Sequence, residues 1–162
     1  MTKILITGSK GFIGRQVIER LKKSEVITDS IGSKRIDLKN IEEVMRLSKS
    51  DVVIHLGGKT SKGLDWNEYF SNNVLGTLNV LEYCIRKNIK KMIFVSSYIY
   101  GNPEYSPIDE EHPISPHNAY AKSKFLAEQL CEFYAKKFDL NVIILRPFNI
   151  FGKTLPKGFL IS

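Results

Sequence analysis

The stretch Lys3-Ile4-Leu5-Ile6-Thr7-Gly8-Ser9-Lys10-Gly11-Phe12-Ile13-Gly14 decides the fold. Its first five residues form a short, β-branched apolar run, which is typical of a buried parallel strand. After the glycines, apolar residues recur at helical spacing as far as Leu21. The segment is therefore predicted to be a strand, a tight loop and a helix, which together open a βαβ unit.

The glycine-rich loop predicts a phosphate site. A helix N-terminus carries unpaired N–H groups and a partial positive charge, so it holds a pyrophosphate. Gly8 permits the tight turn, Gly11 lets the backbone approach the phosphates, and Gly14 lets the helix pack against the strand. The spacing is one residue longer than the G-x-G-x-x-G fingerprint, and a glycine-rich turn without a ligand is the alternative. The predicted dinucleotide contacts are Gly8, Ser9, Lys10, Gly11, Phe12, Ile13 and Gly14.

Residues 25–29 form a second short apolar run that ends at Asp29. A carboxylate there hydrogen-bonds a ribose 2′-OH and favours NAD, although Asp29 follows Gly14 by fewer than the usual ~20 residues and could simply start a turn. Lys34 and Arg35 follow closely and could instead receive the 2′-phosphate of NADP. NAD is the predicted cofactor and NADP the alternative.

Strands and helices alternate along the rest of the chain. Three further apolar runs lie at residues 51–56, 91–95 and 141–145. Helical patterns lie at residues 66–85 and 119–138. This alternation predicts βαβ units with right-handed crossovers, and hence an α/β fold with a Rossmann-type doubly wound parallel sheet.

Composition narrows the function classes. The chain has 162 residues, enough for one domain with a core. Its net charge is +7, but the lysines are spread as doublets near helix ends, so a positively charged surface that binds nucleic acid is not predicted. Cys84 and Cys131 lie in helical patterns without metal-ligand spacing, so we expect buried thiols, no metal site and a cytoplasmic protein. No apolar run approaches ~18 residues and no charged-then-apolar leader is seen, so neither a membrane partner nor a signal peptide is expected.

A candidate catalytic pair lies in Tyr120-Ala121-Lys122-Ser123-Lys124. Residues four apart share one face of a helix, so the Lys124 ammonium is expected to lower the pKa of Tyr120 from about 10 towards the range of a general acid/base. An isolated pair of this kind is usually a packed ring beside a lysine. The glycine-rich loop and Ser96-Ser97, which follow a strand, favour the catalytic interpretation.

Taken together, the motifs resemble those of the extended short-chain dehydrogenase/reductase family, the NAD-dependent sugar-nucleotide epimerases and dehydratases. They are Thr7 to Gly14, His55-Leu56, Asn72-Asn73-Val74-Leu75-Gly76-Thr77, Val95-Ser96-Ser97-Tyr98-Ile99-Tyr100-Gly101, Tyr120 to Lys124, and Arg146-Pro147-Phe148-Asn149-Ile150-Phe151-Gly152. They occur in the family's order and cover nearly the whole chain. The resemblance implies NAD(P)-dependent chemistry on a nucleotide-sugar substrate.

The resemblance also implies roles for single residues. Tyr120 would transfer the proton, and Lys124 would bind the nicotinamide ribose. A serine would steady the reacting sugar oxygen: counting back from Gly101, as in the GDP-fucose synthase-like motif, selects Ser96 and leaves Ser97 as a substrate contact. Further contacts are implied for Asp37, Leu38, Leu56, Gly57, Gly58, Asn72 and Pro147 with the cofactor and for Asn149 with the substrate.

Departures from the family's pattern refine the expected function. Dehydratases usually carry an Asp-Glu pair where this chain has Ser97 and Tyr98, which favours epimerisation or reduction. The predicted function is an NAD-dependent nucleotide-sugar epimerase. The alternatives are an NADP-dependent 4-keto-sugar-nucleotide reductase and a non-catalytic dinucleotide-binding module.

Length and the long helices give two further expectations. Members of the family run to roughly twice this length, so we expect a Rossmann domain over residues 1–152, only the start of a substrate-binding region at 153–162, and a largely absent substrate domain. The isolated chain should then bind cofactor with negligible turnover. The helical patterns near residues 66–87 and 119–138 are expected to form a homodimer, as they do in the family.

Overall fold

The computed structural model describes residues 1–21, 24–31, 34–60, 63 and 65–152. The strands of the main sheet are β1 (Lys3–Thr7), β2 (Glu25–Thr28), β5 (Val52–His55), β6 (Lys91–Val95) and β7 (Asn141–Leu145). The helices are α1 (Phe12–Arg20), α2 (Ile41–Met45), α3 (Trp66–Tyr69), the π-helical η1 (Phe70–Leu75), α4 (Gly76–Arg86) and α5 (Ala119–Lys137). A small antiparallel pair, β3 (Ser30–Ile31) and β4 (Lys34–Arg35), stands apart from the sheet.

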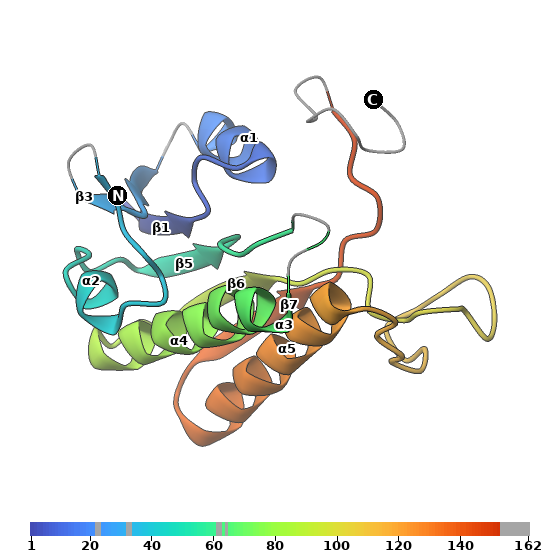
Figure 1. Ribbon diagram of the computed structural model, residues 1–162. Helices are drawn as coiled ribbons and strands as arrows, with labels where there is room; N and C mark the ends of the chain where they lie inside the picture. The colour runs from blue at the N-terminus through green and yellow to red at the C-terminus, as the bar shows by residue number, and fades with distance from the viewer. Residues whose placement is uncertain (22–23, 32–33, 61–62, 64, 153–162) are drawn as a thin grey trace.

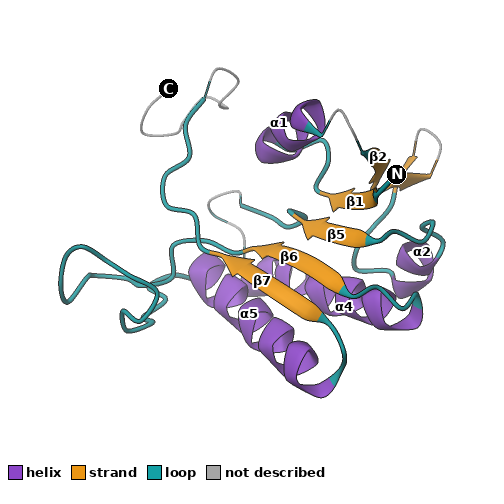
Figure 2. Ribbon diagram, turned by 180° about the vertical axis from the view of Figure 1, so that it is seen from behind, coloured by secondary structure: helices purple, strands orange, loops and turns teal. Residues whose placement is uncertain are grey.

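The sheet has the order β2-β1-β5-β6-β7, and every neighbouring pair is parallel. Helix α1 lies on one side of it, and α2, α4 and α5 lie on the other (Figures 1 and 2). These features confirm the predicted doubly wound, Rossmann-type α/β fold. Because β2 is added on one side of β1 and β5 on the other, the winding reverses between β1 and β5, which is where open α/β sheets bind ligands.

The main core lies between the sheet and the layer of α2, α4 and α5. Its fully buried members include Leu5, Val53, Phe94, Val80, Leu81, Tyr83, Cys84, Ala127 and Cys131. Both cysteines are free thiols, and burial raises the pKa of each to about 12. They are therefore inert packing residues at neutral pH.

The helix expected over residues 66–85 contains one irregular turn. Segment η1 is π-helical and joins α3 to α4, and the Thr77 hydroxyl donates to the Asn73 carbonyl at 2.6 Å where α4 begins. π-helical turns occur frequently at functional sites, because the extra residue changes which side chains face inward. Here the turn lies beside the loop that follows β5, since the Lys59 amide donates to the Asn73 side chain.

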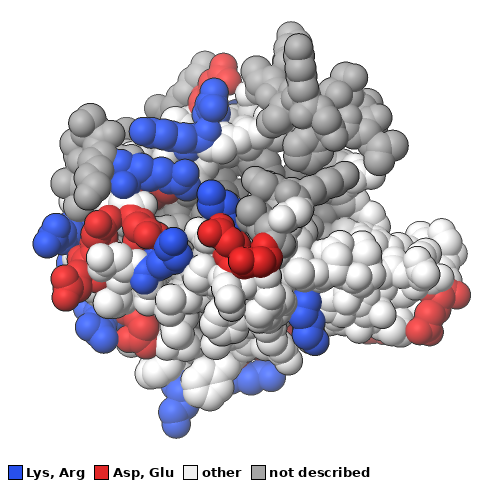
Figure 3. Space-filling model, viewed as in Figure 1, with Lys and Arg blue, Asp and Glu red and all other residues white. Residues whose placement is uncertain are grey.

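Charged side chains do not gather by sign on the face drawn in Figure 3, where Lys and Arg alternate with Asp and Glu. A single-sign stripe of the kind that binds a nucleic-acid backbone is not seen on this face. Among the described residues, no helix combines the length and the hydropathy needed to cross a membrane.

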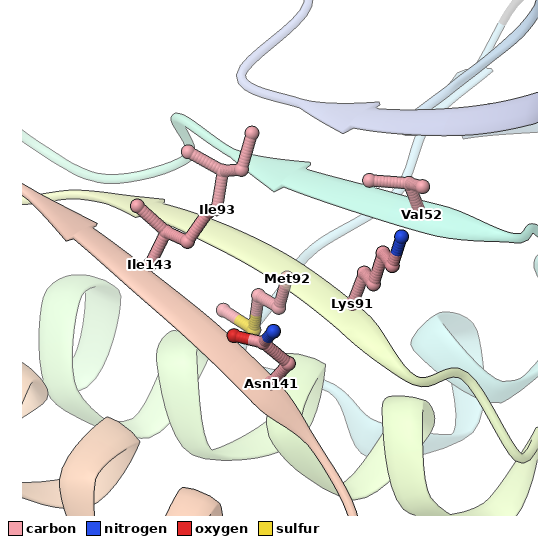
Figure 4. Close-up of a pocket in the computed structure, with 6 residues that line it drawn as sticks. All are labelled: Val52, Lys91, Met92, Ile93, Asn141 and Ile143. Carbon is pink, nitrogen blue, oxygen red and sulfur yellow. The ribbon is translucent and has the colours of Figure 1, made fainter.

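Over β5, β6 and β7, no helix among the described residues covers the opposite face of the sheet (Figure 2). Side chains there alternate with those of the core, and Ile143 and Leu145 are 52% and 47% exposed. Val52, Ile93 and Ile143 point away from the helical layer and border a hollow of about 180 Å³ (Figure 4). In the described part of the chain α1 is the one helix on this side, and it packs near β1 (Figure 1). Parallel sheets are ordinarily covered on both faces, so this exposure is unusual.

Candidate functional site

The glycine-rich loop lies close over the end of β5. Gly8 has φ +70°, and a Cβ there would lie 2.7 Å from the Leu56 carbonyl carbon. A Cβ on Gly14 would lie 2.3 Å from the Gly8 carbonyl oxygen, so helix α1 can approach the loop only without one. Gly11 precedes α1 as its N-cap without a side-chain hydrogen bond, which leaves the first amides of the helix for another acceptor. This cradle fits a pyrophosphate.

Asp29 organises the glycine-rich loop. Its carboxylate is fully buried and accepts hydrogen bonds from the Gly8 amide at 3.0 Å, from the Ser9 amide at 3.2 Å and from the Ser9 hydroxyl. Arg35 Nε lies 3.1 Å from Asp29 Oδ2. Burial works against the charged form, but these hydrogen bonds and Arg35 outweigh it and lower the pKa of Asp29. Protein donors thus contact both oxygens of the carboxylate for which the sequence predicts a ribose contact.

The residues expected near the adenine differ in what they contact. The Asp37 carboxylate accepts from the Lys39 amide at 3.0 Å in the turn before α2, and its side chain is exposed. Leu38 is buried, and its Cδ1 would lie 2.4 Å from a Cβ on Gly57. Leu38 therefore packs against the loop that follows β5, whereas Asp37 stabilises the turn that precedes α2.

A buried histidine joins the strands at the switch point. His55 Nδ1 lies 2.5 Å from the Thr7 hydroxyl and Nε2 lies 3.0 Å from the Thr77 hydroxyl, and the Gly57 amide donates to the same Thr7 oxygen at 3.1 Å. Burial first, and repulsion by Lys124 second, lower the pKa of His55 to about 3. The ring is therefore neutral, and it ties the ends of β1 and β5 to α4.

Asn73, the neighbour of the predicted contact Asn72, is fully buried beside the loop that follows β5. Asn73 Oδ1 accepts from the Lys59 amide at 2.7 Å, and its Nδ2 donates to the Lys59 carbonyl at 3.1 Å and to the Ser123 hydroxyl at 2.9 Å. A Cβ on Gly58 would lie 2.8 Å from Asn73 Oδ1. The Asn72 side chain instead donates to the Glu68 carbonyl within its own helix.

The structure brings Ser97, not Ser96, to Tyr120. A hydrogen bond from Ser97 acts to lower the pKa of Tyr120. The Ser96 amide donates to the Leu145 carbonyl at 2.8 Å, which extends the ladder by one residue, and its buried hydroxyl has no hydrogen-bond partner among the described residues. Ser97, the first residue beyond this ladder, is half-buried.

The expected effect of Lys124 on Tyr120 is not present in this structure. Burial raises the pKa of Tyr120, the hydrogen bond to Ser97 opposes this, and neighbouring Tyr69 adds to it. The Lys124 ammonium lies 4.3 Å from the centre of the Phe94 ring and is only 4% exposed. Burial lowers the pKa of Lys124 to about 8, against the opposing influence of Cys131 and Glu128. The ammonium packs on an aromatic face, and its hold on the proton is weakened.

One turn beyond Lys124, the buried Glu128 pairs with Arg146, and Arg146 Nη2 lies 2.7 Å from Glu128 Oε2. Arg146 lies directly before Pro147, which is implied for cofactor contact. It lies three residues before the exposed Asn149, which is implied for substrate contact. Glu128 and Asn73 were not singled out from the sequence. Glu128 could have been found from its four-residue spacing to Lys124. Asn73 could have been found because Asn72 and Asn73 are adjacent, so either one could have been the asparagine of the site.

Comparisons with known proteins agree with this geometry. Residues 4–161 match the family described as the NAD dependent epimerase/dehydratase family. A putative UDP-glucose 4-epimerase of Methanocaldococcus jannaschii is 33% identical, over 96% of this chain and 58% of that protein. The structure of RMD from Pseudomonas aeruginosa complexed with NADPH superposes with a TM-score of 0.89 at 29% identity, over 99% of this chain and 58% of that one.

A second solved structure belongs to the same group. A short-chain dehydrogenase/reductase superfamily protein from Agrobacterium tumefaciens with bound NAD gives a TM-score of 0.80 at 28% identity, over 89% of this chain and 48% of that one. The chain spans about half the length of the relatives that it matches. By its match and its fold, the chain belongs to the NAD dependent epimerase/dehydratase family of enzymes.

Proposed function

We propose that the chain binds NAD across the switch point between β1 and β5 and forms the cofactor half of a nucleotide-sugar epimerase. The observation that carries the proposal is the pair Tyr120 and Lys124, one turn apart at the start of α5, together with the glycine-rich cradle after β1. A pure dinucleotide-binding module would need the cradle but not this pair. The relatives named UDP-glucose 4-epimerase support a nucleotide sugar as the substrate.

The cradle of Gly8, Gly11 and Gly14 would hold NAD, which when bound would supply hydride-accepting and hydride-donating chemistry for one sugar carbon. Tyr120 takes the proton from the hydroxyl on that carbon and gives it back when the hydride returns. Ser97 holds the same oxygen by a hydrogen bond while its charge changes. Lys124, as an ammonium, favours the deprotonated form of Tyr120 once it turns from Phe94 towards the ribose. Asn73, through Ser123, steadies the start of α5, because the Ser123 hydroxyl also donates to the Tyr120 carbonyl at 2.7 Å.

A one-way NADP-dependent reductase of a 4-keto-sugar nucleotide is the second candidate. It is favoured by Arg35, whose side chain is 47% exposed beside the end of β2, where it could meet a 2′-phosphate. The NADPH-bound neighbour supports the same possibility for this chain. Buried Asp29 beside Arg35 offsets that positive charge, so we retain NAD as the proposed cofactor.

Titration calorimetry tests the cofactor. We expect the chain to bind NAD more tightly than NADP, because the carboxylate of Asp29 opposes a 2′-phosphate at this place. Gly14→Val should abolish binding of both, since its Cβ would meet the Gly8 carbonyl at 2.3 Å. Arg35→Ala should weaken NADP binding selectively. Tighter binding of NADP by the parent chain would move the proposal to the reductase.

We also propose a homodimer through the outer faces of α4 and α5. Phe133 on α5 is 57% exposed, and Phe70, in η1 just before α4, is 43% exposed. Light scattering should show a dimer that Phe133→Glu dissociates, because a buried unpaired carboxylate is costly. Ile143→Glu, on the bare sheet face, is the matched control and should leave the dimer intact. Dissociation by the control alone would place the interface on the sheet.

A further inference from the structure

Glu128 is a fully buried carboxylate on the helix that carries the proposed catalytic pair. It lies four residues beyond Lys124 and eight beyond Tyr120, so the three side chains follow one face of α5. A buried carboxylate is unfavourable unless it is fully paired, and an apolar residue could fill the same space. Its contacts therefore show what the charge accomplishes there.

The partner of Glu128 is Arg146, the first residue after β7. Arg146 Nε lies 3.2 and 3.1 Å from the two Glu128 oxygens, and Nη2 lies 2.7 Å from Oε2. The arginine side chain is 17% exposed. A guanidinium that meets both oxygens of a carboxylate is fixed in orientation as well as in position. The pair thus ties the middle of α5 to the start of the segment that follows β7.

Arg146 extends this link to the segment that follows β6. Its Nη1 donates to the Tyr100 hydroxyl at 3.2 Å, and the guanidinium lies 5.5 Å from the centre of the Tyr100 ring. Phe148 contacts Tyr98 and Tyr100 with ring centres 5.1 and 6.2 Å apart. The two segments that carry Ser97 and Asn149 are therefore joined to α5 through one ion pair.

Glu128 also acts electrostatically on Lys124 and raises its pKa. The titratable groups that act on Lys124 are Glu128 and Cys131 on α5 and His55 on β5. His55 is neutral and the Cys131 thiol is uncharged at neutral pH, since their pKa values are about 3 and about 12. Glu128 opposes the effect of burial on the Lys124 ammonium.

We propose that the Glu128–Arg146 pair is a positioning element of the site: it fixes the segments after β6 and β7 against α5. The inference rests on the proposed function for the meaning of the site, but not for its geometry. Glu128 and Arg146 act through Ser97, Lys124 and Asn149 and need not touch cofactor or substrate.

The test compares three variants with the parent chain. Glu128→Gln removes the charge and keeps the shape. The double variant Glu128→Leu with Arg146→Met replaces the pair by apolar side chains, which commonly restores stability but cannot restore the contact with Tyr100. Asp139→Asn is the control, because it breaks the exposed Lys90–Asp139 pair, 2.7 Å long, beyond the other end of α5.

Three readouts are measured on each variant. They are the Lys124 titration by NMR of labelled lysines, amide hydrogen exchange over residues 97–101 and 146–150, and NADH affinity by fluorescence. In Glu128→Gln we expect the pKa of Lys124 to fall, because a group that raises it is lost. Exchange should quicken in both segments, and NADH affinity should fall roughly tenfold as the site loosens. The double variant should share these changes although it is stably folded, and Asp139→Asn should match the parent.

The outcomes separate the two proposals. A folded double variant with the parent's hydrogen exchange in both segments would overturn the positioning role, even if Glu128→Gln fails to fold. A parent chain that does not bind NADH would overturn the proposed function, whereas the exchange results would still decide whether the pair positions these segments.

Discussion

Replacing Tyr120 with phenylalanine should lower turnover of a nucleotide sugar by about 10²–10⁴-fold, the usual contribution of one acid/base group. The phenylalanine keeps the ring contact with Tyr69, whose centre lies 5.9 Å away, but loses the hydroxyl that Ser97 hydrogen-bonds. NAD affinity should change little, because the glycine-rich cradle is untouched. Turnover is measured on a polypeptide that also contains a region equivalent to the second half of the relatives.

Tyr105→Phe is the matched control for this experiment. Tyr105 is exposed and its hydroxyl donates to Asp109 at 2.8 Å, away from the proposed site. It should leave turnover unchanged. If Tyr120→Phe were as active as the parent, Tyr120 would not be the proton-transfer residue.

Acid should destabilise the fold through His55. The folded ring has a pKa of about 3, against an ordinary value of 6.5, because burial disfavours its charged form. Between these values the unfolded chain binds a proton that the folded chain does not bind. The free energy of unfolding should therefore fall as pH drops below about 6.5, approaching about 1.4 kcal/mol per pH unit.

Urea denaturation between about pH 4 and 6.5 measures this slope, since the lowered pKa of Asp29 places its own contribution below that window. His55→Gln removes the titrating ring. In this variant the slope of the free energy of unfolding against pH should therefore be smaller by the contribution of about one proton. His117→Gln, at an exposed histidine, should keep the parent's slope. Equal slopes for parent and His55→Gln would show that His55 is not the group that titrates.

The fold could be predicted from the sequence because its signals are local. The apolar runs that became β1, β5, β6 and β7 are continuous, as strands buried in a parallel sheet are, and the glycine spacing marks the turn after β1. Gly8 was assigned the tight turn and has φ +70°, and Gly14 was assigned the close approach of the helix that the structure has. These features depend on a few consecutive residues, so periodicity reveals them.

Details of the site depended on contacts that periodicity does not set. The ladder between β6 and β7 runs one residue further than the apolar pattern, which buries Ser96 and frees Ser97. The π-helical turn alters the inward side chains near Asn72 and Asn73, and ordinary helical spacing gives no sign of it. The direction of the Lys124 ammonium was likewise decided by Phe94, a residue 30 positions away in the chain.

The stability of this domain depends on whether another layer covers the exposed face of β5, β6 and β7. Ile143 and Leu145 each leave about half of their side chain in water. Full burial of such a side chain contributes about 1.5–3 kcal/mol, so these two residues together withhold roughly that amount from folding. Any layer that binds this face in the folded state alone would stabilise the fold by mass action, by an amount that grows with its concentration relative to its Kd. The melting temperature of the chain should then rise with the concentration of whatever covers the face, whereas a chain with the layer covalently attached would melt independently of concentration.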